Sequence, residues 1–214
     1  MILAQNAYAY LDADLCVLPA IRAEKRPAIG RWKVFQKRLP TTSELSAWLS
    51  NRPGRSEKSP DAVCIVCGAV SGNTEMIDFD GGGELFDAWC KAIPAELLRR
   101  LVIESTPSGG WHVVYRCYEK ICGNLKLAQR KDGEKVVTLI ETRGEGGLFL
   151  CAPTEGYELA QGDLCNLPVL TVEERDILLQ AAWALNEYQP PMAQGQPLSA
   201  HRGELCATVG ENGG

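Results

Sequence analysis

The chain has 214 residues, of which 45% are hydrophobic and 23% charged, a composition typical of one globular domain with a short appendage. No apolar run reaches the roughly 18 residues that a membrane-spanning helix needs, and the N-terminus lacks the basic start and cleavage pattern of a signal peptide. Nine cysteines, an odd number scattered through apolar segments, favour free thiols in a reducing compartment. We therefore expect a cytoplasmic protein with no membrane partner.

The charge is distributed unevenly along the chain. The net charge of −5 argues against a nucleic-acid partner, but residues 1–154 carry +2 and residues 155–214 carry −7. Basic side chains gather at positions 22–38 and again at 116–135. Such runs are typical of a solvated surface, and they favour a phosphate-binding surface only where a candidate site lies beside them.

Helix-like and strand-like segments alternate along the chain, which indicates an α+β fold. Helices are expected at 3–12, from a cap at Thr41 or Thr42 to Trp48, at 84–93, at 94–101 and at 171–188. Strands are expected at 15–21, 63–68, 74–79, 102–105, 111–118, 136–141 and 148–151, with a hairpin joining 63–68 to 74–79 through the turn at 71–73. The chain beyond Gln189, rich in proline, glycine and glutamine, is expected to be a linker or disordered tail.

Two carboxylates two residues apart end one of these strands, in the sequence I-D-F-D. Because side chains alternate along a strand, Asp78 and Asp80 should point to the same face, with Phe79 turned into the core. Like charges this close are costly unless a cation lies between them, and carboxylate oxygens suit Mg²⁺ or Mn²⁺. The simpler explanation of a lone D-x-D is a polar strand end that leads into a glycine turn.

One of the two histidines follows a turn of small residues, in S-T-P-S-G-G-W-H. Small residues leave backbone N–H groups free to approach an anion, and Ser108 adds a hydroxyl donor beside Gly110. His112 could instead be an ordinary strand histidine. Trp111 should alternate to the opposite face and join the core.

A third acid, Glu141, ends a β-branched stretch in I-E-T-R-G-E-G-G. Glu145 is a rival ligand, but it lies among glycines, whereas Glu141 ends the strand. Arg143 falls on the same face as Glu141 if the strand continues, and its guanidinium could hold a triphosphate or simply pair with an acid. Together the three segments predict divalent-metal and phosphate chemistry.

Two other sequence features are weaker. Cys64 and Cys67 form a C-x-x-C, but residues three apart on a strand face opposite ways and would not share one zinc ion. The glycines at 81–83 are not followed by the lysine and hydroxyl residue of a Walker A motif, so this sequence predicts no P-loop helicase module.

The three segments, in this order and spacing, resemble the motifs of the prim-pol domain, the bifunctional DNA primase/polymerase of the archaeo-eukaryotic primase superfamily. They read M-I-D-F-D-G-G, S-T-P-S-G-G-W-H-V-V-Y and L-I-E-T-R-G-E-G-G-L-F-L-C-A-P-T. The resemblance extends upstream to E-K-R-P-A-I-G-R-W and I-V-C-G-A-V-S-G, and it covers residues 5–155. Glu141 departs from the aspartate often present in the third motif.

The resemblance implies a primase-like fold with a mixed or antiparallel RRM-like catalytic sheet flanked by helices. The implied function is that of a DNA primase and polymerase, a template-dependent nucleotidyltransferase that adds nucleotides to a 3′-hydroxyl in the replication of a phage, plasmid or integrated element. Asp78, Asp80 and Glu141 would be the catalytic ligands of Mg²⁺ or Mn²⁺. The nucleotide would be bound by His112, Ser108, Gly110, Arg143, Lys25 and Lys33. The implied partners are a single-stranded DNA template, a dNTP or rNTP, and a helicase module fused C-terminally or acting in trans.

On this basis residues 1–155 are expected to form the catalytic domain, residues 156–189 a helical extension packed on it, and residues 190–214 the tail. The extension helix should lie away from the nucleic-acid groove. Its expected apolar stripe comprises Val172, Ile177, Leu178, Ala181, Ala182 and Leu185. Two other classes stay open: a non-catalytic replication initiator that binds nucleic acid or nucleotide, and a two-metal nuclease in which the same carboxylates position water.

Overall fold

The computed structural model describes residues 2–50 and 60–189. Its five α-helices in these ranges are α1 (Ile2–Asp12), α2 (Thr42–Leu49), α3 (Phe86–Ala92), α4 (Ala95–Arg100) and α5 (Val172–Trp183). Its strands are β1 (Cys16–Ile21), β2 (Arg26–Pro27), β3 (Ala62–Val66), β4 (Thr74–Phe79), β5 (Val102–Ser105), β6 (Trp111–Cys117), β7 (Lys126–Asp132), β8 (Lys135–Arg143), β9 (Leu148–Leu150), β10 (Glu158–Gln161) and β11 (Val169–Leu170). The expected tail at 190–214 lies outside the described residues.

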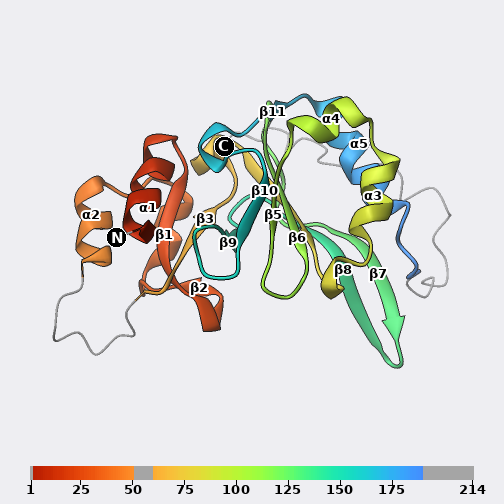
Figure 1. Ribbon diagram of the computed structural model, residues 1–214, viewed down its shortest axis with the longest axis horizontal. Coiled ribbons are helices and arrows are strands. Elements are labelled where there is room, and N and C mark those ends of the chain that lie inside the picture. The colour runs from red at the N-terminus through yellow and green to blue at the C-terminus, as the bar shows by residue number, and fades with distance from the viewer. Residues whose placement is uncertain (1, 51–59, 190–214) are drawn as a thin grey trace, which may run out of the picture.

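The strands form two sheets, and the α+β prediction is confirmed. The smaller sheet has the order β2-β1-β3-β9, and the larger one has the order β10-β5-β6-β4-β8-β7, with β11 added beside β6. All pairings are antiparallel except that of β11 with β6. Figure 1 shows α1 and α2 beside the smaller sheet, and α3, α4 and α5 grouped against the larger one.

The expected hairpin of residues 63–68 and 74–79 is reduced to one antiparallel bridge between Gly68 and Thr74, and the pairing of the two strands is wrong. β3 pairs with β1 and β9 in the smaller sheet, while β4 pairs with β6 and β8 in the larger one. The connection is held by the buried Ser71, whose hydroxyl donates to the Val66 carbonyl at 2.5 Å and accepts from the Cys16 amide at 2.9 Å. A turn sequence therefore marks the change of direction correctly but does not say which strand the next one joins.

The smaller sheet explains why its strands read as continuous apolar runs. Every residue of β1 and of β3 is buried, because both faces of this sheet are covered. One face packs under α1 and α2. Helix α2 begins at a capping box formed by Thr41 and Glu44. Strands covered on both sides show no polar alternation, which matches the L-C-V-L-P-A-I sequence.

α3, α4 and α5 cover one apolar face of the larger sheet, while Met76, Val102 and Val114 on its other face pack in the core against the smaller sheet. Phe79 packs edge-on against Trp89, with ring centroids 5.1 Å apart, and the Trp89 indole donates to the Leu178 carbonyl at 3.0 Å. Trp111 stacks on Phe86 at 4.7 Å, so its predicted place on the core side is confirmed. Because side chains alternate, the residues between these core positions face the other way, and they build the candidate site.

A buried ion pair fastens α5 to this apolar face. Glu75 of β4 is fully buried and accepts from Arg175 Nε at 2.6 Å and from Nη2 at 2.8 Å. The Tyr115 hydroxyl donates to the same carboxylate at 2.9 Å. Both charges are thus satisfied inside the protein, which a buried carboxylate and guanidinium require.

The prediction for the C-terminal helix is confirmed in position and partly wrong in orientation. α5 begins at a capping box of Thr171 and Glu174, as expected. Leu178, Ala181 and Ala182 are buried, and Leu185 packs beside them. Val172 and Ile177 are exposed by 49% and 40%, and Leu179 is buried in their place. The buried face of the helix is therefore rotated toward Leu179 and away from Val172 and Ile177, relative to the stripe that the sequence predicted.

The expected domain boundary at residue 155 falls inside the larger sheet. β10 pairs with β5 and β11 pairs with β6, so strands on both sides of residue 155 share one hydrogen-bonded sheet. The division into a catalytic unit and an extension stays a prediction. Within the described ranges, no helix combines the length and the apolar character that crossing a membrane requires.

The cysteines follow the expectation with one exception. Of the eight cysteines within the described residues, seven are free thiols, namely Cys16, Cys64, Cys67, Cys90, Cys117, Cys151 and Cys165. Cys122 is disulfide-bonded, so the expectation that all nine are free is wrong there. Cys64 and Cys67 belong to different hydrophobic clusters, as the alternation of strand side chains predicts.

Candidate active site

A row of charged side chains crosses four neighbouring strands of the larger sheet. His112 of β6 lies directly opposite Glu104 of β5 on one side and opposite Asp78 of β4 on the other. Asp78 in turn lies opposite Glu141 of β8. Directly opposite residues in paired strands share a face, so this row points away from the helices.

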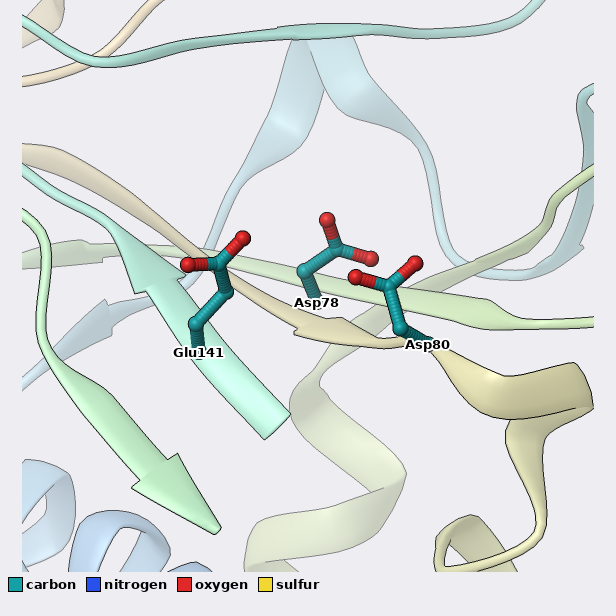
Figure 2. Close-up of side chains that lie close together, drawn as sticks. All are labelled: Asp78, Asp80 and Glu141. Carbon is teal, nitrogen blue, oxygen red and sulfur yellow. The ribbon is translucent and has the colours of Figure 1, made fainter. Parts of the chain in front are cut away.

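Asp78, Asp80 and Glu141 converge at the centre of this face (Figure 2). One carboxylate oxygen from each lies within 4.8 Å of those of the other two. Glu145, the rival ligand, is turned elsewhere, because its carboxylate accepts from the Ala69 amide at 2.8 Å. The geometry thus favours Glu141 over Glu145 as the third acid of the group.

Burial sets the electrostatics of this triad. Burial raises the pKa of Asp78, opposed by the charge of His112 and reinforced by Asp80. Burial also raises the pKa of Glu141, opposed by Arg143. Ionising an acid with a raised pKa costs free energy. A divalent cation bound among the carboxylates would offset this cost.

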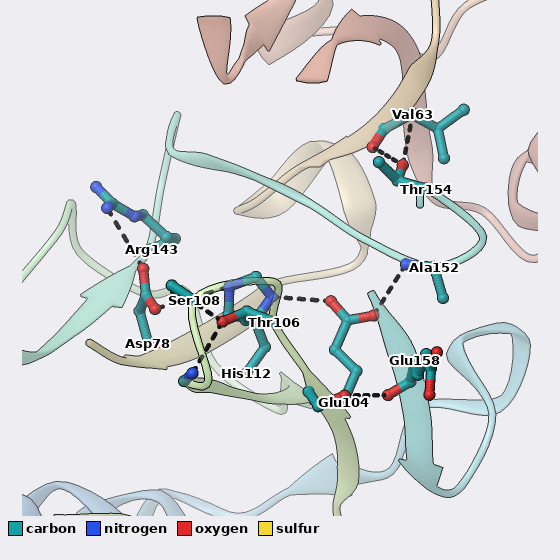
Figure 3. Close-up of polar contacts among 12 residues, drawn as sticks. Val63, Asp78, Glu104, Thr106, Ser108, His112, Arg143, Ala152, Thr154 and Glu158 are labelled. Carbon is teal, nitrogen blue, oxygen red and sulfur yellow. Dashed lines mark hydrogen bonds and ion pairs between the residues drawn. The ribbon is translucent and has the colours of Figure 1, made fainter. Parts of the chain in front are cut away.

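Arg143 is the cation nearest to the triad. Its Nη2 atom lies 2.5 Å from Glu141 Oε1. It also lies 3.6 Å from Asp78 Oδ2 (Figure 3). β8 continues through residue 143, which is the condition under which Arg143 shares the face of Glu141. The ion pair that the sequence left open is therefore present in this structure.

The triad fits a divalent ion. Three carboxylates offer hard oxygen ligands from three positions, a donor set that suits Mg²⁺ or Mn²⁺ better than a thiolate-preferring metal. Besides burial, the charges of Asp78 and Asp80 raise the pKa of Glu141, so the acids disfavour its ionised form unless a cation lies among them. The residues present can thus hold a metal, and its identity is not fixed by this geometry.

A cleft of ≈ 430 Å³ lies beside the triad, between the two sheets. Five of the residues expected at the site line it, namely Asp78, Asp80, His112, Arg143 and Lys25. The smaller sheet contributes Lys25 through the turn between Arg22–Glu24 and β2, where Lys25 has a positive φ of 47°. Negatively and positively charged side chains thus line the same cleft.

Four other expected residues do not line this cleft, namely Glu141, which joins the triad beside it, and Lys33, Ser108 and Gly110. Lys33 is exposed on the short helical segment Trp32–Gln36. Ser108 is exposed in the turn before β6, where its hydroxyl lies 3.1 Å from Thr106 Oγ1. Gly110 is packed so closely that an added Cβ would lie 2.3 Å from the Phe79 carbonyl oxygen. The glycine is thus required for the close approach of β6 to β4 rather than for an open anion pocket.

A family model described as the N-terminal domain of bifunctional DNA primase/polymerase (Prim-Pol) matches residues 7–170. The chain belongs to this family. The match confirms the resemblance and ends at the last residue of β11, beyond the expected boundary at residue 155. No curated protein matches the chain. The family is one of DNA primase/polymerase enzymes, which act on DNA and nucleotides.

Several residues of this prim-pol domain's cleft were missed in the sequence. Arg26, Trp32 and Tyr157 all line the cleft, and burial raises the pKa of Tyr157 to about 12. Arg26 and Trp32 lie in the upstream segment E-K-R-P-A-I-G-R-W of the resemblance, but the sequence assigned neither of them a role, and no local pattern marks Tyr157. Glu104 had a signal, since it is the one charged residue in the apolar run L-V-I-E of β5.

Proposed function

We propose that this prim-pol domain is a template-dependent nucleotidyltransferase that adds nucleotides to a primer 3′-hydroxyl on single-stranded DNA. Its biological setting in this proposal is the replication of a phage, plasmid or integrated element. The observation that carries the proposal is the convergence of three carboxylates beside a cleft that also contains Lys25, Arg26 and Arg143. Carboxylates and positively charged side chains around one cleft suit a substrate whose phosphates bind together with a divalent cation.

Asp78, Asp80 and Glu141 would hold Mg²⁺ or Mn²⁺. Bound there, divalent ions would activate the 3′-hydroxyl and neutralise the charge of the departing pyrophosphate. The carboxylates' task is to fix the position of that charge relative to the reacting ends. Asp78 and Asp80 come from one strand and Glu141 from its neighbour, so the sheet itself keeps the ligands in place.

Arg143 and Lys25 are proposed to bind the triphosphate. A cation held by Glu141 and Asp78 would satisfy the charges that Arg143 neutralises in this structure. The guanidinium would then be available for two parallel hydrogen bonds to a phosphate. Lys25 faces the same cleft from the smaller sheet, which allows the nucleotide to be bound from both sides.

The remaining expected residues have indirect roles in this proposal. Ser108 and Gly110 shape the turn that precedes His112, and Lys33 adds positive charge next to Trp32, which lines the cleft. Lys126 of β7 lies directly opposite Glu141 of β8, where its positive charge would attract the phosphates of the DNA backbone. The acidic residues of α5 lie over the opposite face of the sheet, where they do not oppose phosphates.

Primer extension tests the proposal. Labelled dNTPs and rNTPs are supplied with a single-stranded template, a 3′-hydroxyl primer and Mn²⁺ or Mg²⁺. The proposal predicts longer products with the wild type and with Glu145→Gln, a control acid outside the triad, but not with Glu141→Gln. Shortened primers would indicate a nuclease. DNA binding without any change in primer length would indicate a non-catalytic module, and either result would overturn the proposal.

A further inference from the structure

Glu104 is a fully buried carboxylate outside the three sequence motifs. It lies on β5, directly opposite His112, at the end of the charged row that contains the metal-binding candidates. A carboxylate with no exposure needs a partner for each oxygen. The two partners of Glu104 define what it does.

Both oxygens of Glu104 are engaged (Figure 3). Oε1 lies 2.8 Å from His112 Nδ1, and Oε2 accepts from the Ala152 amide at 3.0 Å. The amide comes from the loop after β9, so the carboxylate is clamped between the larger sheet and the chain that follows the smaller one. Glu104 therefore cannot rotate without losing one of the two bonds.

The arrangement fixes which nitrogen His112 presents to the cleft. An ionised carboxylate only accepts hydrogen bonds, so the Nδ1 atom must carry the proton between them. Nε2 then points the other way, and it lies 3.7 Å from Asp78 Oδ1 at the cleft. Phe149 and Tyr157 lie against the ring, with centroids 5.5 Å and 5.7 Å away, and limit its tilt.

We propose that Glu104 is a positioning residue that holds the imidazole of His112 with Nε2 directed at a phosphate of the incoming nucleotide. The bond to His112 stands on the contacts above, whereas the role toward phosphate rests on the proposed function. A buried carboxylate that orients a histidine in this way fixes its ring. Phosphate oxygens only accept hydrogen bonds, so Nε2 contacts a phosphate as the N–H donor of an imidazolium, in which both ring nitrogens carry a proton. Without it, the ring can turn its Nδ1 edge to the cleft.

Nuclear magnetic resonance tests the bond without any activity measurement. The chain has two histidines, so a His201→Gln variant leaves one imidazole to observe. We expect a low-field Nδ1–H proton, protected from exchange, that disappears in His112→Ala. In Glu104→Gln it should vanish or move, because one amide oxygen cannot accept from both His112 and Ala152. Absence of the resonance from the parent protein, or its persistence unchanged in Glu104→Gln, would overturn the proposal even if that variant were unstable.

Nucleotide titration tests the consequence for binding. With Mn²⁺ present, Glu104→Gln should raise the nucleotide dissociation constant about 10-fold, the lower end of what loss of an orienting partner of a histidine causes. Its affinity for DNA should not change. Glu75→Gln is the matched control, because Glu75 is equally buried but bonds to Arg175 on the other face of the sheet. The nucleotide affinity of Glu75→Gln should equal that of the wild type.

The outcomes separate this inference from the proposed function. Loss of the Nδ1–H resonance in Glu104→Gln together with unchanged nucleotide affinity would overturn the positioning role. An equal loss of affinity in Glu75→Gln would also overturn it, since the effect would then be general destabilisation. A wild type that shows the resonance but binds no nucleotide would instead contradict the proposed function and leave the bond to His112 supported.

Discussion

Strand β4 contains buried acids on both of its faces, and the two faces treat them differently. Glu75 points to the helices and receives four hydrogen bonds, two from Arg175, one from Tyr115 and one from the Cys117 thiol. Asp78 points to the cleft, where His112 and Arg143 lie at 3.7 Å and 3.6 Å, beyond hydrogen-bond length. Burial raises the pKa of Asp78 accordingly.

The difference separates a structural charge from one prepared for a ligand. On the helix face every buried charge is satisfied by a protein group, and the result is a fixed α5. On the cleft face one guanidinium pairs with Glu141 and Asp78 out of the three carboxylates, so negative charge remains for a cation to neutralise. The predictions below test this contrast from each side.

The largest expected effect comes from removing the acids of β4 on the cleft face. Asp78→Ala combined with Asp80→Ala should reduce nucleotide incorporation on the order of a thousand-fold or more, since loss of even one group that stabilises transition-state charge costs about 10²–10³. Thermal unfolding should be no easier than in the wild type, because mutually repelling charges are gone. Primer extension and calorimetry measure the two effects, and wild-type incorporation would show that the triad is not the active site.

The second effect concerns the helix face. Arg175→Met should lower the free energy of unfolding by about 3–5 kcal/mol, because it leaves the charge of Glu75 buried without its partner. Adding Glu75→Gln to this variant should restore much of the loss. Urea titration measures both variants. A change in unfolding free energy near zero for Arg175→Met would mean that Glu75 is neutral in the folded protein.

Metal binding and the protonation of Asp78 and Glu141 should both change stability through the cleft face. Because burial raises the pKa values of Asp78 and Glu141, their protonated forms favour the folded state. Without metal, this stability is present below the ordinary carboxyl pKa and is lost as the pH rises through the raised values. At neutral pH, Mn²⁺ at 100 times its dissociation constant should add about 2.7 kcal/mol.

Melting curves with EDTA or Mn²⁺ check this prediction. An Asp78→Asn and Glu141→Gln double variant is the control, and it should lose both the acid-side stabilisation and the response to Mn²⁺. Equal Mn²⁺ stabilisation of this variant would indicate that the ion binds elsewhere.

His112→Ala should weaken nucleotide binding about 10-fold or more, as expected for loss of a hydrogen bond to a charged group, worth about 1.5–3 kcal/mol. Template binding should change less, because His112 lies inside the cleft and is 5% exposed. Separate titrations with nucleotide and with DNA measure the two affinities. A variant that loses DNA affinity but binds nucleotide normally would reverse the assignment.

The smallest expected effect is that of ending the chain at residue 189. All the groups of the proposed site lie earlier in the sequence, so primer extension should match that of the whole chain. Ending it at residue 170 instead removes α5, which exposes the apolar face around Trp89 and leaves Glu75 without Arg175. Loss of incorporation on removal of 190–214 alone would show that the tail supplies part of the site.

Alternation along single strands made part of this site predictable. The sequence M-I-D-F-D predicts that Asp78 and Asp80 share a face opposite Phe79, and the structure has this arrangement. The continuation of β8 through Arg143 was left open, because T-R-G has no apolar partner residue to mark the strand end. β7 was not predicted, because K-L-A-Q-R-K-D is polar and lacks a strict alternation.

Register was beyond the reach of the sequence. Glu104, His112 and Asp78 face one another because the register of β5, β6 and β4 places them directly opposite one another. No local sequence pattern encodes that register. The same reason explains the wrong hairpin at 63–79, where both strands were identified but each belongs to a different sheet. Pairing depends on contacts between distant segments, whereas periodicity reports only which face of one segment is apolar.

The central claim is that the cleft face of the larger sheet binds a catalytic divalent ion. The most direct measurement is a crystal structure with Mn²⁺ and a nucleotide, in which anomalous scattering locates the ion. We predict a manganese peak about 2–2.2 Å from oxygens of Asp78, Asp80 and Glu141, with the triphosphate between it and Arg143. Manganese bound away from these carboxylates, or a nucleotide bound with Arg143 still closed on Glu141 and no ion present, would contradict the account.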